Sequence, residues 1–78
     1  MYYTYVLISE KDHQLYIGWS DDLTNRLKEH QSGNVMSTKD RLPIKLVYYE
    51  ACLSKEKAII REKQLKNGYG RRYLKHRI

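Results

Sequence analysis

Residues 2–19 read YYTYVLISEKDHQLYIGW, and this stretch decides the fold. Both ends of the stretch are rich in aromatic and β-branched residues, whereas residues 9–14 between them are mostly polar. Two such runs separated by a short polar link are typical of neighbouring β-strands. We therefore expect strands at Tyr2 to Ile8 and at Leu15 to Trp19.

The alternation of side chains along the two strands decides where the tyrosines point. Successive residues of a strand face opposite sides of the sheet, so the apolar residues of the second strand share one face and leave Tyr16 and Gly18 on the other. Tyr5 and Tyr16 can then converge, and a phenol can give or accept a proton at such a point. Gly18 predicts cleared space beside Tyr16, for a bulge, a ligand or a neighbouring helix. Simple packing is the alternative, because tyrosine is common in strands.

The following residues predict a helix, a loop and a third strand. Ser20 or Asp21 can cap the helix, which should stop near Gly33, where a left-handed residue is easily accommodated. Residues 34–44 are polar and carry the only proline near their end, so they predict a loop. Lys45 to Ala51 repeats the aromatic and β-branched composition of the first two strands.

The last third of the chain predicts two more helices. One begins after Ser54 and ends at Asn67-Gly68, and the basic tail 71–78 forms the other, with Gly70 marking its start. No internal repeat, low-complexity tract or linker divides the chain. We therefore expect one small α+β domain over residues 1–78, in which helices flank a three-stranded, mainly antiparallel sheet.

Positive charge is concentrated in the last third of the chain. The net charge is +6, but residues 54–78 hold nine Lys and Arg against two acidic residues, whereas residues 1–53 hold six against seven. A basic segment attracts phosphates and loses affinity as salt rises, because binding releases counterions. Charge alone leaves a solvated helix surface as an equal alternative.

Composition also bears on the compartment. No apolar run approaches the roughly 18 residues that span a bilayer, and the N-terminus lacks the pattern of a signal peptide. We therefore expect a cytoplasmic protein without a membrane partner. The single cysteine, Cys52, has no partner for an internal disulfide and lies in an apolar stretch, so we expect a buried thiol.

The first helix carries two candidates for site chemistry, Arg26 and His30, which lie one turn apart on the same side. We expect both at the edge of the core, half sheltered. The guanidinium could clamp a phosphate bidentately, and a neutral imidazole could accept or relay a proton. The alternatives are a surface ion pair of Arg26 with Asp22 and a helix-end histidine whose hydrogen bonds are satisfied.

Glu62 projects within the apolar arc of the second helix, which is an unusual place for a carboxylate. Burying an unpaired carboxylate costs several kcal/mol. A cation such as Arg26 or a bound metal ion would relieve this cost, and so would access to solvent. An internal salt bridge is an equally good explanation from helix geometry alone.

These residues, in this order, resemble the GIY-YIG nucleases, and the resemblance extends from Tyr3 to the basic tail. It looks strongest for the small stand-alone members similar to the N-terminal nuclease domain of the DNA-repair excinuclease, whose signatures match residues 61–66 and 68–71. The family's two motif tyrosines, helix arginine, following tyrosine or histidine, and metal-binding glutamate correspond to Tyr5, Tyr16, Arg26, His30 and Glu62. Tyr3-Thr4 replaces the Gly-Ile of the first motif, and the family's C-terminal asparagine has only a weak match in Asn67.

The resemblance implies an endonuclease that hydrolyses phosphodiester bonds with one Mg²⁺ or Mn²⁺ ion, in DNA repair or processing. Tyr16, assisted by Tyr5 and His30, would draw the proton from the attacking water. Arg26 would stabilise charge on the phosphate, and Glu62 would hold the ion. A phenol has a pKa of about 10, so Tyr16 needs a nearby positive charge to act as a base near neutral pH.

Nucleic acid, with DNA favoured, is the expected partner, and a protein partner or larger assembly could supply further specificity. Five basic residues of the loop, second helix and tail are candidates for phosphate contacts: Lys39, Arg41, Lys66, Arg71 and Arg72. The competing hypothesis is a non-catalytic module that keeps the nuclease fold, in which the tyrosines stack on unpaired bases.

Overall fold

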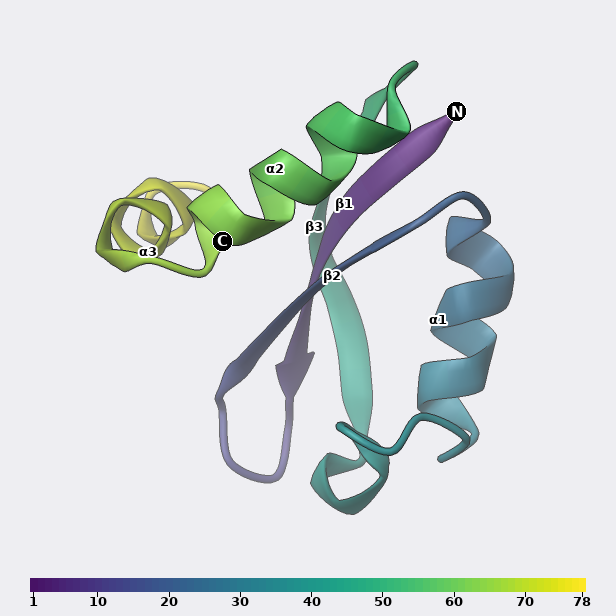
Figure 1. Ribbon diagram of the computed structural model, residues 1–78. Coiled ribbons are helices and arrows are strands. Elements are labelled where there is room, and N and C mark those ends of the chain that lie inside the picture. Colours follow the sequence, from purple (N-terminus) through teal and green to yellow (C-terminus); the bar gives the residue numbers. More distant parts are fainter.

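The computed structural model describes the whole chain, residues 1–78. Its strands and helices follow one another in the predicted order, and the predicted α+β class is confirmed (Figure 1). No helix combines the length and apolarity that a membrane crossing needs. The bounds are β1 Tyr2–Ser9, β2 Leu15–Ser20, α1 Leu23–Gln31, a short 3₁₀ helix η1 Lys39–Arg41, β3 Ile44–Cys52, α2 Lys55–Leu65 and α3 Gly68–Lys75.

The sheet is antiparallel throughout, with β1 in the centre and β2 and β3 at its edges. Tyr5 lies opposite Gly18 of β2 and opposite Tyr49 of β3. The register between β1 and β3 shifts after Val6, as it does at a β-bulge. Leu7 pairs with Tyr16, so Tyr5 and Tyr16 are diagonal neighbours across adjacent strands.

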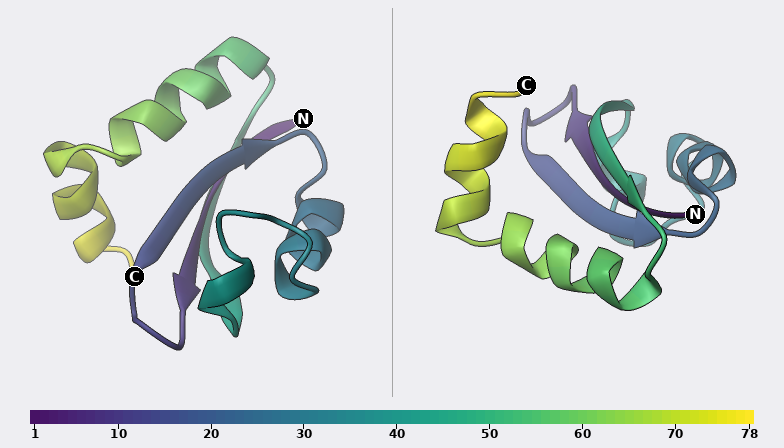
Figure 2. Two further views of the ribbon diagram at one scale, coloured as in Figure 1. Left: turned by 60° about the horizontal axis from the view of Figure 1, so that its bottom comes forward. Right: turned by 90° about the horizontal axis from the view of Figure 1, so that it is seen from above.

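The helices cover the two faces of the sheet separately, with α1 on one side and α2 and α3 on the other (Figures 1 and 2). Tyr5 and Leu7 belong to the apolar cluster on the α1 face. Val6 packs with Leu65 and Leu74 of α2 and α3 on the opposite face. The predicted alternation of β1 is thereby confirmed, and burial of each such aliphatic side chain contributes about 1.5–3 kcal/mol.

The start of α1 differs from the prediction of a Ser20 or Asp21 cap. Asp22 is the N-cap, and its carboxylate accepts a hydrogen bond from the backbone N–H of Asn25 at 3.1 Å. The hydroxyl of Ser20, two residues before Asp22, instead accepts a hydrogen bond from the N–H of Asp22. The predicted end of the helix is confirmed, since Gly33 has φ of 82° just beyond it.

The start of α3 also differs from the prediction, because Gly70 lies inside the helix rather than at its beginning. Asn67 caps α3 with its side-chain oxygen, which accepts from the N–H of Gly70 at 3.1 Å. A Cβ at Gly70 would collide with the backbone of Leu65, so this glycine allows α3 to pack closely against the end of α2. Asn67, the weak match to the family asparagine, therefore has a structural role as a cap.

Candidate active site

Tyr5 lies at the centre of the sheet with only 1% of its surface exposed. Its phenol covers Gly18, where an added Cβ would lie 2.6 Å from the Tyr5 hydroxyl oxygen. The expectation that Gly18 clears space beside Tyr16 is therefore wrong. The missing side chain makes room for the ring of Tyr5, its partner across the two strands.

His30 links this phenol to the loop that follows α1. Its Nε2 lies 2.9 Å from the Tyr5 hydroxyl oxygen, and its Nδ1 lies 2.8 Å from Oγ1 of Thr38. His30 and Thr38 are both wholly buried, so the expectation of a half-sheltered His30 at the edge of the core is wrong. Burial lowers the pKa of His30, and the nearby Arg26 cation acts in the same direction. The imidazole is therefore neutral near pH 7, with one nitrogen donating and the other accepting.

Tyr16 completes what we call the Tyr16 cluster, made of Tyr5, Tyr16 and His30. Its ring centroid lies 5.1 Å from that of His30 and 6.4 Å from that of Tyr5. Burial raises the pKa of Tyr5 and outweighs the opposing effect of Arg26, so Tyr5 remains a neutral phenol. Tyr16 is half-buried on an edge strand, and its hydroxyl makes no hydrogen bond to another side chain. Tyr16 is therefore the member of the cluster whose hydroxyl is not held by another side chain.

Arg26 lies beside the cluster, one helical turn before His30. Its side chain is 35% exposed, and its guanidinium lies 3.6 Å from the carboxylate of Glu29, so the expected alternative of a pair with Asp22 is wrong. The adjacent Tyr5 oxygen raises the pKa of Arg26. The group is therefore a fixed cation at the mouth of the cluster.

Glu62 lies on α2 and approaches the sheet from the opposite face. Its side chain is 16% exposed, and its Oε1 lies 2.9 Å from Nζ of Lys66, one turn later. Of the explanations for its position, the internal salt bridge is the one that the structure contains. The negative charge of Glu62 is one of the smaller contributions that raise the pKa of Tyr5.

Glu62 could bind a metal ion only at a site where most of the other ligands are water or substrate. Nowhere in the chain do three or more His, Cys, Asp or Glu side chains gather in an arrangement that could hold a metal ion. Mg²⁺ commonly keeps several waters and takes one or two carboxylates together with substrate phosphates. Glu62 can therefore serve as the protein ligand of an ion whose remaining ligands are water and phosphate.

A hollow of about 540 Å³ lies between the β1–β2 connection and the helices α2 and α3. Its lining includes Tyr16, Lys66 and Arg71, so two of the predicted phosphate-binding residues border the same hollow as this tyrosine, whose ring packs on the α1 face. The other candidates lie apart from the hollow. Arg72 is exposed on α3, Lys39 is exposed on η1, and Arg41 on η1 pairs with Asp12 at 3.2 Å.

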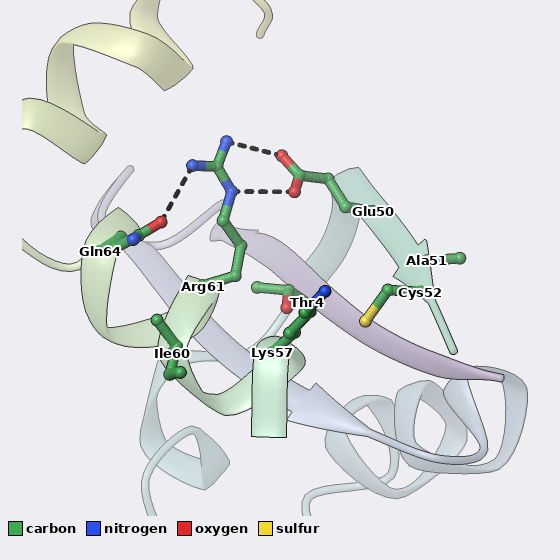
Figure 3. A pocket seen from close by; sticks show the side chains of 8 residues that line it. All are labelled: Thr4, Glu50, Ala51, Cys52, Lys57, Ile60, Arg61 and Gln64. Atoms are coloured by element: carbon green, nitrogen blue, oxygen red, sulfur yellow. Dashed lines mark hydrogen bonds and ion pairs between the residues drawn. The ribbon is translucent and has the colours of Figure 1, made fainter. Parts of the chain in front are cut away.

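A second group of tyrosines lies on the α2 and α3 side of the sheet. We call it the Tyr48 cluster, and sequence reasoning did not find it. Glu50 of β3 receives two hydrogen bonds of 2.9 Å from Arg61 of α2, and Tyr48 and Tyr73 also donate to its Oε2. Figure 3 shows Arg61 between Glu50 and Gln64, beside a cavity of about 310 Å³. Cys52 also lines this cavity and is only half-buried, since it ends an edge strand, so the prediction of a buried thiol is wrong.

Thr38 is the residue of the Tyr16 cluster that sequence reasoning missed. It lies in the predicted loop, and its hydroxyl holds the second nitrogen of His30. Neither its spacing nor its neighbours distinguish it from Ser37 in the sequence. For Glu50 and Arg61 the only available signal was their opposite charge.

Comparisons with known proteins agree with this architecture. The sequence model of the GIY-YIG catalytic domain family matches residues 1–75 of this chain. A UPF0213 protein of Clostridium perfringens is 42% identical over 67 residues, which cover 85% of this chain and 71% of that protein. A UPF0213 protein of Streptococcus pneumoniae is 43% identical over 65 residues, which cover 82% of this chain and 65% of that protein.

A solved structure supports the same assignment. The solution NMR structure of a UPF0213 protein from Bacillus halodurans is similar to this chain with a TM-score of 0.56 and 35% identity. The similarity covers 95% of this chain and 82% of that one. Since the family model spans nearly all of the residues and the solved relative shares the fold, this chain belongs to the GIY-YIG nuclease family.

Proposed function

We propose that this protein is a divalent-metal-dependent endonuclease that hydrolyses phosphodiester bonds of nucleic acid, with DNA in repair or processing as the expected substrate. The observation that carries the proposal is the hydroxyl of the half-buried Tyr16, which makes no hydrogen bond to another side chain. The Tyr16 ring lies 5.1 Å from that of the neutral His30, and Tyr16 also borders the hollow that Lys66 and Arg71 line. This supports a proton acceptor close to cations that can hold phosphate.

In the proposed reaction the phenolate form of Tyr16 takes a proton from the water that attacks phosphorus and becomes a neutral phenol. A phenol ionises near neutral pH only beside positive charge, and Arg26 lies at the mouth of the cluster. Tyr5 and His30 keep the ring of Tyr16 in position and offer neutral hydrogen-bonding groups beneath it. Arg26 also stabilises the charge that develops on the phosphate oxygens.

Glu62 is the proposed metal ligand, and a bound Mg²⁺ or Mn²⁺ would stabilise negative charge on the leaving oxygen. Lys66 holds Glu62 in the absence of the ion. We propose that Lys66, Arg71 and Arg72 contact the phosphate backbone around the hollow. Lys39 and the partly paired Arg41 would contact a longer substrate at η1.

Cleavage assays test the proposal directly. Purified protein is incubated with branched, nicked, single-stranded and duplex DNA, with Mg²⁺, with Mn²⁺ or with chelator. We expect metal-dependent cleavage of at least one substrate. Glu62→Gln should abolish cleavage but keep the fold and nucleic-acid binding. Glu56→Gln is the matched control, because Glu56 is an exposed residue of the first turn of the same helix.

Two other outcomes have a clear meaning. Cleavage that continues in chelator would show that the reaction does not depend on a metal ion bound by Glu62. Binding without cleavage of any substrate would favour the non-catalytic module instead. In either case affinity should fall as salt rises, and replacing Arg71 and Arg72 by Ala should flatten that slope by about one or two phosphate contacts.

A further inference from the structure

The helix α3 presents a surface of which the proposed function uses only Arg71 and Arg72, as phosphate contacts. Gly70 and Leu74 form its buried side, while Arg71 and Arg72 are exposed. Residues 66–78 contain five Lys and Arg and no acidic residue. The helix folds back so that the C-terminus approaches the β1–β2 connection (Figure 2). This surface is therefore strongly positive and lies next to the hollow.

Tyr69 stands on this basic surface with 56% of its area exposed. Its ring lies 6.2 Å from that of Tyr73, at an angle of 33° between the planes. Tyr73 is fixed in turn, because the guanidinium carbons of Arg77 and Arg61 lie 3.6 Å and 4.6 Å from its ring centroid. Tyr69 thus presents an exposed ring beside a firmly held aromatic neighbour, and packing in the core does not explain it.

An exposed aromatic ring among cations is the arrangement that binds unpaired nucleotides. Bases stack on aromatic side chains while basic groups hold the phosphates, and this requires base faces that a duplex keeps inside its own stack. We propose that Tyr69 is a stacking platform for an unpaired nucleotide and that α3 thereby selects substrates with a single-stranded segment beside the cleaved bond. The inference rests on the proposed function only in taking nucleic acid as the ligand.

The position of Arg71 connects the platform to the candidate active site. Arg71 lines the same hollow as Tyr16. Tyr69, two residues earlier, lies on the other side of the helix, with Arg72 on the exposed side between it and Arg71. A strand whose phosphate lies in this hollow can therefore continue over the exposed side of α3, past Arg72, to reach Tyr69. Branched or flapped DNA, which joins duplex to single strand, is the class of substrate that fits this path.

The other strongly exposed tyrosine shows that exposure alone is not the argument. Tyr49 is 55% exposed, nearly the same as Tyr69. It lies on the α1 side of the sheet, in a hollow that it shares with Tyr3, Asp21 and Asp22. Two carboxylates there repel phosphate, so Tyr49 offers a matched ring in the opposite electrostatic surroundings.

Binding of fluorescent DNA without metal tests the inference independently of cleavage. In chelator, the protein is titrated into a short single strand that carries 2-aminopurine and into the corresponding duplex. Tyr69→Ala should weaken single-strand binding by about 5- to 100-fold, the range expected for one stacked base, and leave duplex binding within twofold. Tyr69→Phe should retain wild-type affinity, and Tyr49→Ala should leave the affinity for both single strand and duplex unchanged.

The remaining outcomes separate the two proposals. Equal losses on single strand and duplex, or no loss on either, would overturn the role of Tyr69 while leaving the nuclease proposal intact. Failure of the wild type to bind any nucleic acid would instead overturn the proposed function. Amide NMR spectra of each variant, compared with wild type, show that the fold is unchanged.

Discussion

The two tyrosine clusters lie on opposite faces of one sheet and differ in what surrounds their hydroxyl groups. In the Tyr16 cluster the partners are neutral, and the hydroxyl of Tyr16 makes no hydrogen bond to another side chain. In the Tyr48 cluster the hydroxyls of Tyr48 and Tyr73 both donate to Glu50, which Arg61 already holds with two hydrogen bonds. A group of tyrosines therefore suggests chemistry only where a hydroxyl remains available.

The pKa shifts of the Tyr48 cluster explain why it stabilises the fold and takes no part in proton transfer. Burial acts to raise the pKa of Glu50, but the hydrogen bonds from Arg61 and Tyr48 outweigh it, and the net shift is downward. Burial and the hydrogen bond to Glu50 raise the pKa of Tyr48. Carboxylate and phenol thus each keep their ordinary protonation state near pH 7, and the cluster ties α2 and α3 to β3.

The largest effect we expect is on the rate of cleavage when Tyr16 is changed to Phe. The ring and its packing remain, but the proton acceptor is lost, so cleavage should slow by at least about a hundredfold. Tyr73→Phe is the matched change in the other cluster and should alter the rate less than about fivefold, the effect of one ordinary hydrogen bond. Single-turnover rates at saturating substrate measure both. Similar losses in both variants would remove the distinction between the clusters.

The next effect concerns the packing beneath the Tyr16 cluster. Gly18→Ala places a methyl group against the Tyr5 hydroxyl and should lower the free energy of unfolding by about 1–3 kcal/mol, as overpacking does. Gly68→Ala is the control, since nothing lies within 4 Å of the added carbon. Urea titrations followed by circular dichroism measure the difference. A fully stable Gly18→Ala variant would show that the position of Tyr5 is not constrained by β2.

A smaller effect on stability is expected from a change in the Tyr48 cluster. Glu50→Gln should lower the free energy of unfolding by about 1 kcal/mol, less than a fully buried charged hydrogen bond, because the Glu50 side chain is 29% exposed. The pKa of Glu50 is lower in the folded state than its ordinary 4.5, so its contribution is present above that pH and is lost as the pH falls below it. Glu50→Gln should therefore be less sensitive to acid than wild type below about pH 4.5. Glu56→Gln, a change in an exposed residue, should behave as wild type.

The smallest effect is a pH dependence of stability that arises from His30. Its pKa is lower in the folded state than the ordinary 6.5, so the unfolded chain takes up a proton first as the pH falls. Stability should be constant above about pH 7 and should begin to fall below pH 6.5, by at most about 1.4 kcal/mol per pH unit. The Tyr16 cluster would thus lose stability at a higher pH than the Tyr48 cluster. His30→Gln should remove this slope, and a slope that persists in the variant would assign it to another group.

Much of the fold could be predicted because it depends on local patterns. The sequence predicts strands β1 and β2 within one residue of their observed ends, and alternation groups Tyr16 with Gly18; the pairing of Gly18 with Tyr5 then puts both tyrosines on one face. The cap of α1 was missed because Ser20, Asp21 and Asp22 can all accept the necessary hydrogen bond. The start of α3 was missed because Gly70 is required by contact with Leu65, which no local rule anticipates.

The sequence by itself determined the order of the elements, the faces of the strands and the concentration of positive charge in the last third, because each depends on neighbouring residues. Only the tertiary structure decided which distant groups meet. His30 reaches Tyr5 across 25 positions, and Arg61 reaches Glu50 across 11. Periodicity fixes the side of a helix on which a residue lies but not the rotation of that helix against the sheet. That rotation buried His30 and left the hydroxyl of Tyr16 without a hydrogen bond to another side chain.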